Sequence, residues 1–149
     1  MIPSMGTDPD NPAYGPLRDA AELEAVIALQ SVAFNLSLDY CRAWSDDCGH
    51  DRIRAFRAGG EVVGCAAVHP FGQWFGGRCV PMGGIGAVGI SPEERGSGAA
   101  AALMAGTVRD LRENGVPLSA LYASTQTLYR TAGYERAGSY LRLGCPANS

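Results

Sequence analysis

Residues 87–100 are the part of the sequence that most constrains the fold. An apolar segment ends at Ser91 and Pro92, a glycine-rich turn follows, and an alanine-rich segment begins at Gly98. This pattern is typical of a β-strand that passes through a tight turn directly into an α-helix. The first amides of such a helix have no intrahelical acceptor and lie at the positive end of the helix dipole. We therefore expect a mixed α/β domain whose strand-to-helix turn binds an anion.

The residues of this turn suit a diphosphate. Gly96 and Gly98 allow the backbone to approach a bulky anion, Arg95 adds a positive charge, and Ser97 adds a hydroxyl. A phosphate-binding P-loop would need Gly-Lys-Ser/Thr after the turn, and the sequence has none. A dinucleotide fingerprint would place its glycines after a strand, whereas those at 83–89 lie within the expected strand. The turn alone therefore predicts a diphosphate site that is neither a P-loop nor a dinucleotide-binding turn.

The first third of the chain reads as an irregular arm followed by helices. Residues 1–16 are rich in proline and form the expected arm, and Leu17 and Arg18 begin a short strand. Asp19 and Glu22 have the spacing of a capping box at the start of a helix. The apolar side of that helix carries Leu23, Val26, Ile27 and Phe34. A second helix is expected over residues 37–48.

Strands are expected from residue 51 onwards. The predicted strands cover 51–57 and 61–68, with a turn at 58–60, and Pro70 is expected to end the second of them. After a connection over 71–77, a third strand covers 79–90, and its glycines indicate a bulge or a ligand close to the backbone. The rest of the chain is expected to contain a helix over 98–113, a strand over 117–123, a helix that Ser124 caps and that runs to 132, and a strand over 134–143. Together these elements form one domain over 17–149.

Composition excludes several classes of function. The net charge is −3 and the basic residues are scattered, which argues against nucleic acid as a partner. No apolar segment is long enough to span a membrane, and the N-terminus lacks the pattern of a signal peptide. Five unevenly spaced cysteines favour a reducing, cytoplasmic location over a disulfide framework. The spacing of Cys41, Cys48 and His50 matches no standard zinc site, so we expect no metal.

Two motifs together resemble those of the GNAT superfamily of N-acetyltransferases. Arg95-Gly96-Ser97-Gly98-Ala99-Ala100 matches the superfamily pattern Arg/Gln-x-x-Gly-x-Gly/Ala. Downstream, Tyr129-Arg130-Thr131-Ala132-Gly133-Tyr134 is similar to its Tyr-x-x-x-Gly-Phe/Tyr segment. Over roughly residues 50–140 the chain looks like the N-terminal acetyltransferase domain of Eis-type (enhanced intracellular survival) proteins. The resemblance implies a mixed, mostly antiparallel central sheet with helices on both faces.

The resemblance also implies a reaction and its residues. Acetyl-CoA would be the co-substrate, and a primary amine of a small molecule or a protein would attack its thioester directly in a ternary complex. Tyr129 would protonate the departing thiolate. The expected cofactor contacts are the backbone of Val88, Gly89 and Ile90 for the pantetheine arm, Arg95, Gly96, Ser97, Gly98, Ala99, Ala100 and Ala101 for the pyrophosphate, and Ser124 and Thr125 further along the cofactor.

Several alternatives stay open at this stage. Eis-type proteins are longer and use their chain-terminal carboxylate as the base, so this chain is either a minimal relative or a fragment of a larger one. A non-catalytic acyl-CoA-binding or regulatory domain would keep the same turn. His69 has the chemistry of a base, although a lone histidine at a strand end favours a structural role. The sequence leaves the identity of the acceptor open, and both a monomer and a homo-oligomer stay open as oligomeric states.

Overall fold

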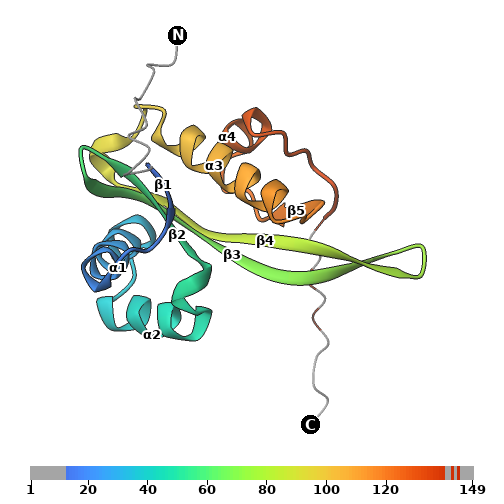
Figure 1. Cartoon of the computed structure of the whole chain (residues 1–149), viewed down its shortest axis with the longest axis horizontal. Coiled ribbons are helices and arrows are strands. Elements are labelled where there is room, and N and C mark those ends of the chain that lie inside the picture. Colours follow the sequence, from blue (N-terminus) through green and yellow to red (C-terminus); the bar gives the residue numbers. More distant parts are fainter. Residues whose placement is uncertain (1–12, 140–141, 143, 145–149) are drawn as a thin grey trace.

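The structure is a computed structural model that describes residues 13–139, 142 and 144. Its centre is a five-stranded sheet in the order β1-β2-β3-β4-β5, antiparallel except for the parallel β4–β5 pair. Figure 1 shows α1 and α2 on one face and α3 and α4 on the other, which confirms the predicted fold class. The elements are β1 (Tyr14–Pro16), α1 (Ala20–Phe34), α2 (Leu38–Cys48), the 3-10 helix η1 (His50–Arg52), β2 (Ile53–Ala58), β3 (Glu61–Phe75), β4 (Arg78–Ile90), the 3-10 helix η2 (Pro92–Glu94), α3 (Ala99–Glu113), β5 (Leu118–Leu121) and α4 (Gln126–Thr131).

Helix α1 begins where the capping pattern predicts. The Glu22 amide donates to Asp19 Oδ1 at 2.9 Å, which satisfies one of the free amides of the first turn. The carboxylate of Glu22 does not return to Asp19 but accepts from the amide of Arg18 at 2.8 Å. The helix ends at Asn35, whose φ of 53° is left-handed. The predicted apolar face is wrong at one position, because Phe34 is 42% exposed.

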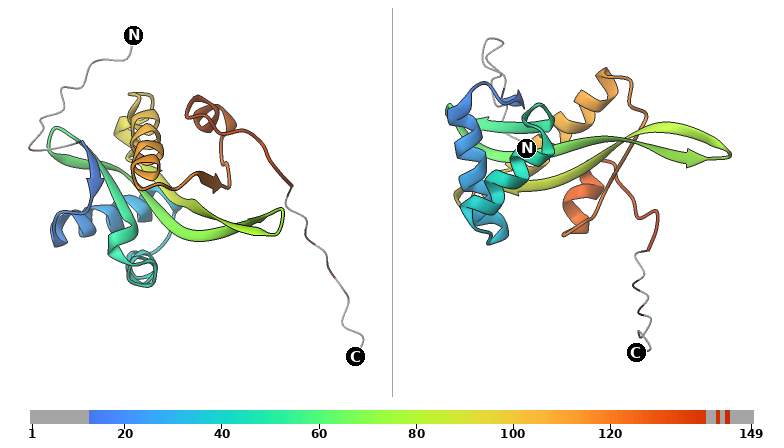
Figure 2. Two further views of the ribbon diagram at one scale, coloured as in Figure 1. Left: turned by 45° about the vertical axis from the view of Figure 1, so that its right-hand side comes forward. Right: turned by 90° about the horizontal axis from the view of Figure 1, so that it is seen from below.

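The hairpin of β3 and β4 is longer than expected. Pro70 does not end β3 but pairs with Gly83, and the segment 71–75, expected as a connection, continues the strand. The reason is that β2 pairs with β3 only as far as Ala67. Within the described residues, β3 beyond this point has a free edge, and a proline is tolerated there because no neighbour needs its missing amide. The paired arms extend beyond the body of the domain (Figure 2).

The N-terminal arm is not irregular throughout. Tyr14–Pro16 form β1 against β2, so the strand lies within the predicted arm and not at Leu17 and Arg18; residues 1–12 lie outside the described part. The pairing is held at both ends, since the Arg57 amide donates to the Ala13 carbonyl and Arg57 Nη2 donates to the Pro16 carbonyl, each at 2.7 Å. These are long-range contacts that local sequence does not reveal.

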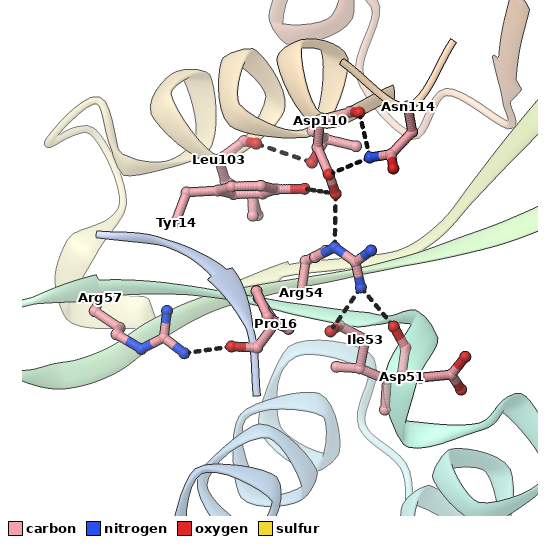
Figure 3. Close-up of polar contacts among 10 residues, drawn as sticks. Tyr14, Pro16, Asp51, Ile53, Arg54, Arg57, Leu103, Asp110 and Asn114 are labelled. Carbon is pink, nitrogen blue, oxygen red and sulfur yellow. Dashed lines mark hydrogen bonds and ion pairs between the residues drawn. The ribbon is translucent and has the colours of Figure 1, made fainter. Parts of the chain in front are cut away.

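Two ion pairs connect the sheet to the helices on its opposite faces. Arg57, only 4% exposed, donates through Nε and Nη2 to the two carboxylate oxygens of Glu22 at 2.6 Å each. Arg54 Nε donates to Asp110 Oδ2 of α3 at 2.7 Å, and the Tyr14 hydroxyl donates to the same oxygen at 3.3 Å (Figure 3). Burial raises the pKa of Tyr14 to about 12, so the phenol stays protonated as a donor.

The C-terminal expectations are partly wrong. Residues 134–139 form no strand, and residues 140, 141 and 143 of the predicted strand lie outside the described residues. The described segment is instead held by local contacts: the Tyr134 ring packs on Tyr129, and Arg130 Nη2 pairs with Glu135 Oε1 at 2.8 Å. Helix α4 has Thr125 at its N-cap without a side-chain hydrogen bond, so Ser124 is not the cap.

Candidate functional site

Strand β4 is left open along part of its length. It pairs with β5 only from Met82 to Ile85. From Gly86 to Ile90, among the described residues, β4 has β3 as its only neighbour. A strand edge without a partner presents backbone N–H and C=O groups that can pair with another chain or a ligand.

A β-bulge lies in the open part of β4. Cys65 pairs with Gly89 and Ala67 with Gly86, so one residue of β3 faces two residues of β4, Ala87 and Val88. Ala87 has a φ of 49°, which is uncommon for a residue with a side chain. The buried thiol of Cys65 lies 3.5 Å from the Ala87 carbonyl oxygen and donates to it, and burial raises the pKa of this thiol to about 12. The predicted bulge is therefore confirmed, and Cys65 is the small core residue that supports it.

Two of the glycines of β4, Gly83 and Gly89, have a different explanation. A Cβ built on Gly89 would lie 2.8 Å from Cδ2 of Leu29 in α1, and one on Gly83 would lie 2.7 Å from Cδ2 of Leu111 in α3. Both distances are shorter than any real contact of this kind. These glycines therefore leave room for side chains of the two helices, and no ligand is needed to account for them.

The predicted anion-binding turn lies directly between β4 and α3. Gly96 and Gly98 have φ values of 87° and 96°, and Gly98 caps the helix without a side-chain bond. The first backbone bond of the helix runs from the Ala102 amide to the Gly98 carbonyl at 3.0 Å. The Ser97 hydroxyl donates to the Glu94 carbonyl at 2.9 Å and accepts from the Ala99 amide at 3.2 Å. Ser97 thus closes the turn, while Arg95 and the two glycines are exposed.

Tyr129 lies in α4, beside α3. The side chain is 6% exposed and packs in a cluster with Ile85, Met104 and Leu111, against which Val88 of the bulge also packs. No residue in the described part of the chain hydrogen-bonds to the Tyr129 hydroxyl, and no fully buried side-chain oxygen there lacks a partner. The phenol oxygen is therefore not completely buried.

The second tyrosine of this motif has a different environment. The rings of Tyr129 and Tyr134 meet edge to face at 6.3 Å. The Tyr134 hydroxyl is 2.8 Å from Ser119 Oγ of β5, and burial raises the pKa of Tyr134. Tyr134 therefore holds α4 against β5. Ser124 and Thr125 are exposed between β5 and α4.

A cavity of about 250 Å³ lies on the opposite face of the sheet, between α1, α2 and the bulge. Sequence reasoning missed most of its wall. The available signal was that apolar residues continue beyond the first helix, at Leu36 in the connection and at Tyr40 in the first turn of α2. Another cavity, of about 420 Å³, lies beside β5 and contains none of the predicted site residues. The first cavity is lined by Gln30, Phe34, Leu36, Tyr40, Cys41, Trp44 and Ala87.

Two further structural observations concern metals and membranes. Within residues 13–139, 142 and 144, no group of three or more His, Cys, Asp or Glu side chains is placed to hold a metal ion. Over the same residues no single helix has the length and apolar character to cross a membrane. Helices α1 and α2 reach that length and composition only when they are taken together, and they are bent by 119° where they meet.

Known proteins resemble this chain over most of its length. The family model of the acetyltransferase (GNAT) domain matches residues 16–137. The mycothiol acetyltransferase of Saccharomonospora viridis is 33% identical over 132 residues, which cover 75% of this chain and 42% of that protein. A GCN5-related N-acetyltransferase from Anabaena variabilis superposes with a TM-score of 0.80 at 39% identity, over 84% of this chain and 32% of the other.

A more distant structure tests the Eis resemblance. Eis1 from Mycobacterium abscessus superposes with a TM-score of 0.66 at 23% identity, over 78% of this chain and 29% of that one, and this likeness concerns the fold. The chain thus spans less than half the length of these relatives. The predicted superfamily is confirmed by the family model and by the two closer similarities. The chain belongs to the GNAT family of acetyltransferases.

Proposed function

We propose that this domain transfers an acetyl group from acetyl-CoA to a primary amine of a small molecule or a protein. The observation that carries the proposal is the open edge of β4 from Gly86 to Ile90, which is followed, after the short 3-10 helix η2, by the glycine-rich N-terminus of α3. An extended amide-containing ligand can pair with such an edge. A diphosphate attached to that ligand would then reach the amides at the start of the helix.

Each predicted residue has a role in this proposal. The backbone of Val88, Gly89 and Ile90 would pair with the pantetheine arm and polarise the thioester carbonyl, because N–H groups aimed at a developing oxyanion stabilise it. Arg95 and the amides of Gly96, Gly98, Ala100 and Ala101 would hold the pyrophosphate. The amides of Ser97 and Ala99 already donate to the Glu94 carbonyl and to Ser97 Oγ, so these two residues would shape the turn. The exposed Ser124 and Thr125 would border the cofactor from the β5 side.

Tyr129 would act as the general acid. When the amine attacks, the C–N bond forms, the C–S bond breaks, and the thiolate of CoA needs a proton. The phenol suits this step because its ring is fixed by packing and its oxygen is not bonded to another residue of the described chain. The cavity beside Ala87 would receive the acceptor, because it reaches the bulge from the other face.

The first experiment measures thermal unfolding with acetyl-CoA and, as a diphosphate control, with ATP. A ligand at about 100 times its Kd stabilises the folded state by roughly 2.7 kcal/mol, which for a domain of this size raises the Tm by about 5–10 °C. We expect this shift with acetyl-CoA and none with ATP. Equal shifts, or no shift with either ligand, would contradict the proposed cofactor site.

Turnover is tested with a matched pair of tyrosine variants. The acceptor panel contains 2-phenylethylamine, spermidine, glucosamine and a lysine-containing peptide, and CoA release is measured. Tyr129→Phe should lower kcat by roughly 10²-fold or more without weakening acetyl-CoA binding. Tyr134→Phe makes the same chemical change but removes only the bond to Ser119, so it should cost about 0.5–1.5 kcal/mol of stability and leave kcat largely intact. Binding of acetyl-CoA without turnover of any acceptor would favour a non-catalytic acyl-CoA-binding domain.

A further inference from the structure

Among the residues that the structure describes, no acidic side chain lines the cavity proposed for the acceptor. Its described lining consists of aromatic, aliphatic, amide and thiol side chains. A primary amine is protonated near neutral pH and must lose a proton before it attacks a thioester. A side chain close to the cavity that accepts this proton would raise the share of bound acceptor in the reactive, neutral form.

His69 is the titratable side chain whose position fits this requirement. It lies on β3, half-buried, and its ring meets Trp44 of the cavity wall edge to face with centroids 6.3 Å apart. A Cβ built on Gly86 would lie 3.8 Å from His69 Nε2, which is ordinary contact distance. The imidazole thus lies over Gly86, next to Ala87, which lines the cavity and belongs to the bulge.

The polar contact that the structure gives His69 Nε2 is a long one to a thiol, which a bound amine or a water molecule can displace. Cys48 of α2 is the polar neighbour, with Sγ 4.0 Å from Nε2. Burial raises the pKa of Cys48, so it stays a neutral, weak donor, and the charges of Arg52 and Asp51 act on that thiol from η1. No carboxylate in the described residues forms an ion pair with His69, whereas the exposed His50 is paired with Asp46 at 2.9 Å.

We propose that His69 is the general base that deprotonates the acceptor amine, directly or through one water molecule. This inference rests on the proposed function. His69 Nε2 takes a proton from the ammonium group, and the neutral amine then attacks the thioester carbon. The C–S bond breaks as the C–N bond forms, Tyr129 gives its proton to the thiolate, and the adduct nitrogen returns a proton to Tyr129 by way of water. His69 releases its proton to solvent, so each turnover yields an amide, CoA thiol and one proton.

The test compares the only two histidines of the chain. The kcat/KM of the wild type, His69→Gln and His50→Gln is measured across pH 5–9 with the best acceptor of the panel. An imidazole changes charge between about pH 5 and 8, so the wild type and His50→Gln should lose activity on the acid side. His69→Gln should be slower by roughly 10²–10⁴-fold and should lack that acid limb.

Two controls separate a base from a structural residue. Acetyl-CoA binding and the Tm of His69→Gln are measured, and both should stay close to the wild type. His69→Ala is assayed with added imidazole, which should restore part of the rate. Retention of the acid limb or of most of the rate in His69→Gln would overturn the inference, and so would a rate loss that only follows lost folding or cofactor binding. A wild type that fails to bind acetyl-CoA would overturn the proposed function as well.

Discussion

Replacing Gly98 with alanine tests whether the turn before α3 is a ligand site or only a turn. Gly98 has a φ of 96°, and a Cβ added there would have no heavy atom within 4 Å. The substitution therefore causes backbone strain without a clash. An L-residue in the left-handed region costs about 1–2 kcal/mol, and the lower entropy of the unfolded alanine chain offsets roughly 0.4–1 kcal/mol of this. We expect a net loss of about 1 kcal/mol, on the order of 2–5 °C in Tm.

Gly115 provides a matched control for this strain. It follows α3 at the other end, with a φ of 70° and no heavy atom within 4 Å of an added Cβ. Gly115→Ala should therefore destabilise the domain by a similar amount. Only Gly98→Ala adds a methyl group at the N-terminal end of α3, where the pyrophosphate would approach, and it should weaken acetyl-CoA binding at least tenfold, about 1.4 kcal/mol. Titration of each variant with acetyl-CoA by calorimetry measures the two affinities. Equal affinities would refute the assignment of the pyrophosphate to this turn.

Three further predictions concern stability. Arg57→Met leaves the largely buried Glu22 carboxylate without its partner and should cost about 3–5 kcal/mol in urea unfolding, and adding Glu22→Gln should recover much of that loss. The pKa of Glu22 is lowered from 4.5, mainly by its bonds to Arg57. The wild type should therefore exceed Glu22→Gln in free energy of unfolding by a constant amount at neutral pH, and this difference should decline as the pH falls below about 4.5. A difference that is unchanged in acid would contradict this prediction. Leu103→Ala removes a fully buried side chain between α3 and the sheet and should cost about 2–5 kcal/mol, and a loss below 1 kcal/mol would show that this core is loosely packed.

Local chemistry accounts for what the sequence predicted well. The cap at Asp19, the turn before α3 and the alternation of β2 depend on residues within a few positions of one another. Such short-range patterns determine a helix start or a strand with little help from the rest of the chain. The glycines of β4 accordingly indicated a bulge. The motifs at 95–100 and 129–134 identified the superfamily by resemblance, and the binding of an anion at the turn stays a prediction.

Long-range pairing decided the rest. Pro70 continues β3 because the pairing of β2 with β3 extends only to Ala67, which faces the first residue of β2. Tyr14–Pro16 form a strand because Arg57 bonds to the backbone at both ends of the segment. A strand was expected over residues 134–143, but residues 134–139 gain no strand to pair with in the described chain.

The functional geometry likewise required the tertiary structure. Sequence alone identified Tyr129 and the turn that begins at Arg95 as candidates, and it left His69 with a structural role. The pairing of β3 with β4 places His69 beside Gly86 and the bulge, and the packing of α2 against the sheet brings Trp44 to the same imidazole. The physical reason is the range of the interactions. A short motif determines the backbone conformation of its own turn. The distances between side chains on β3, α2 and β4 depend on how these separate elements bury their apolar faces together.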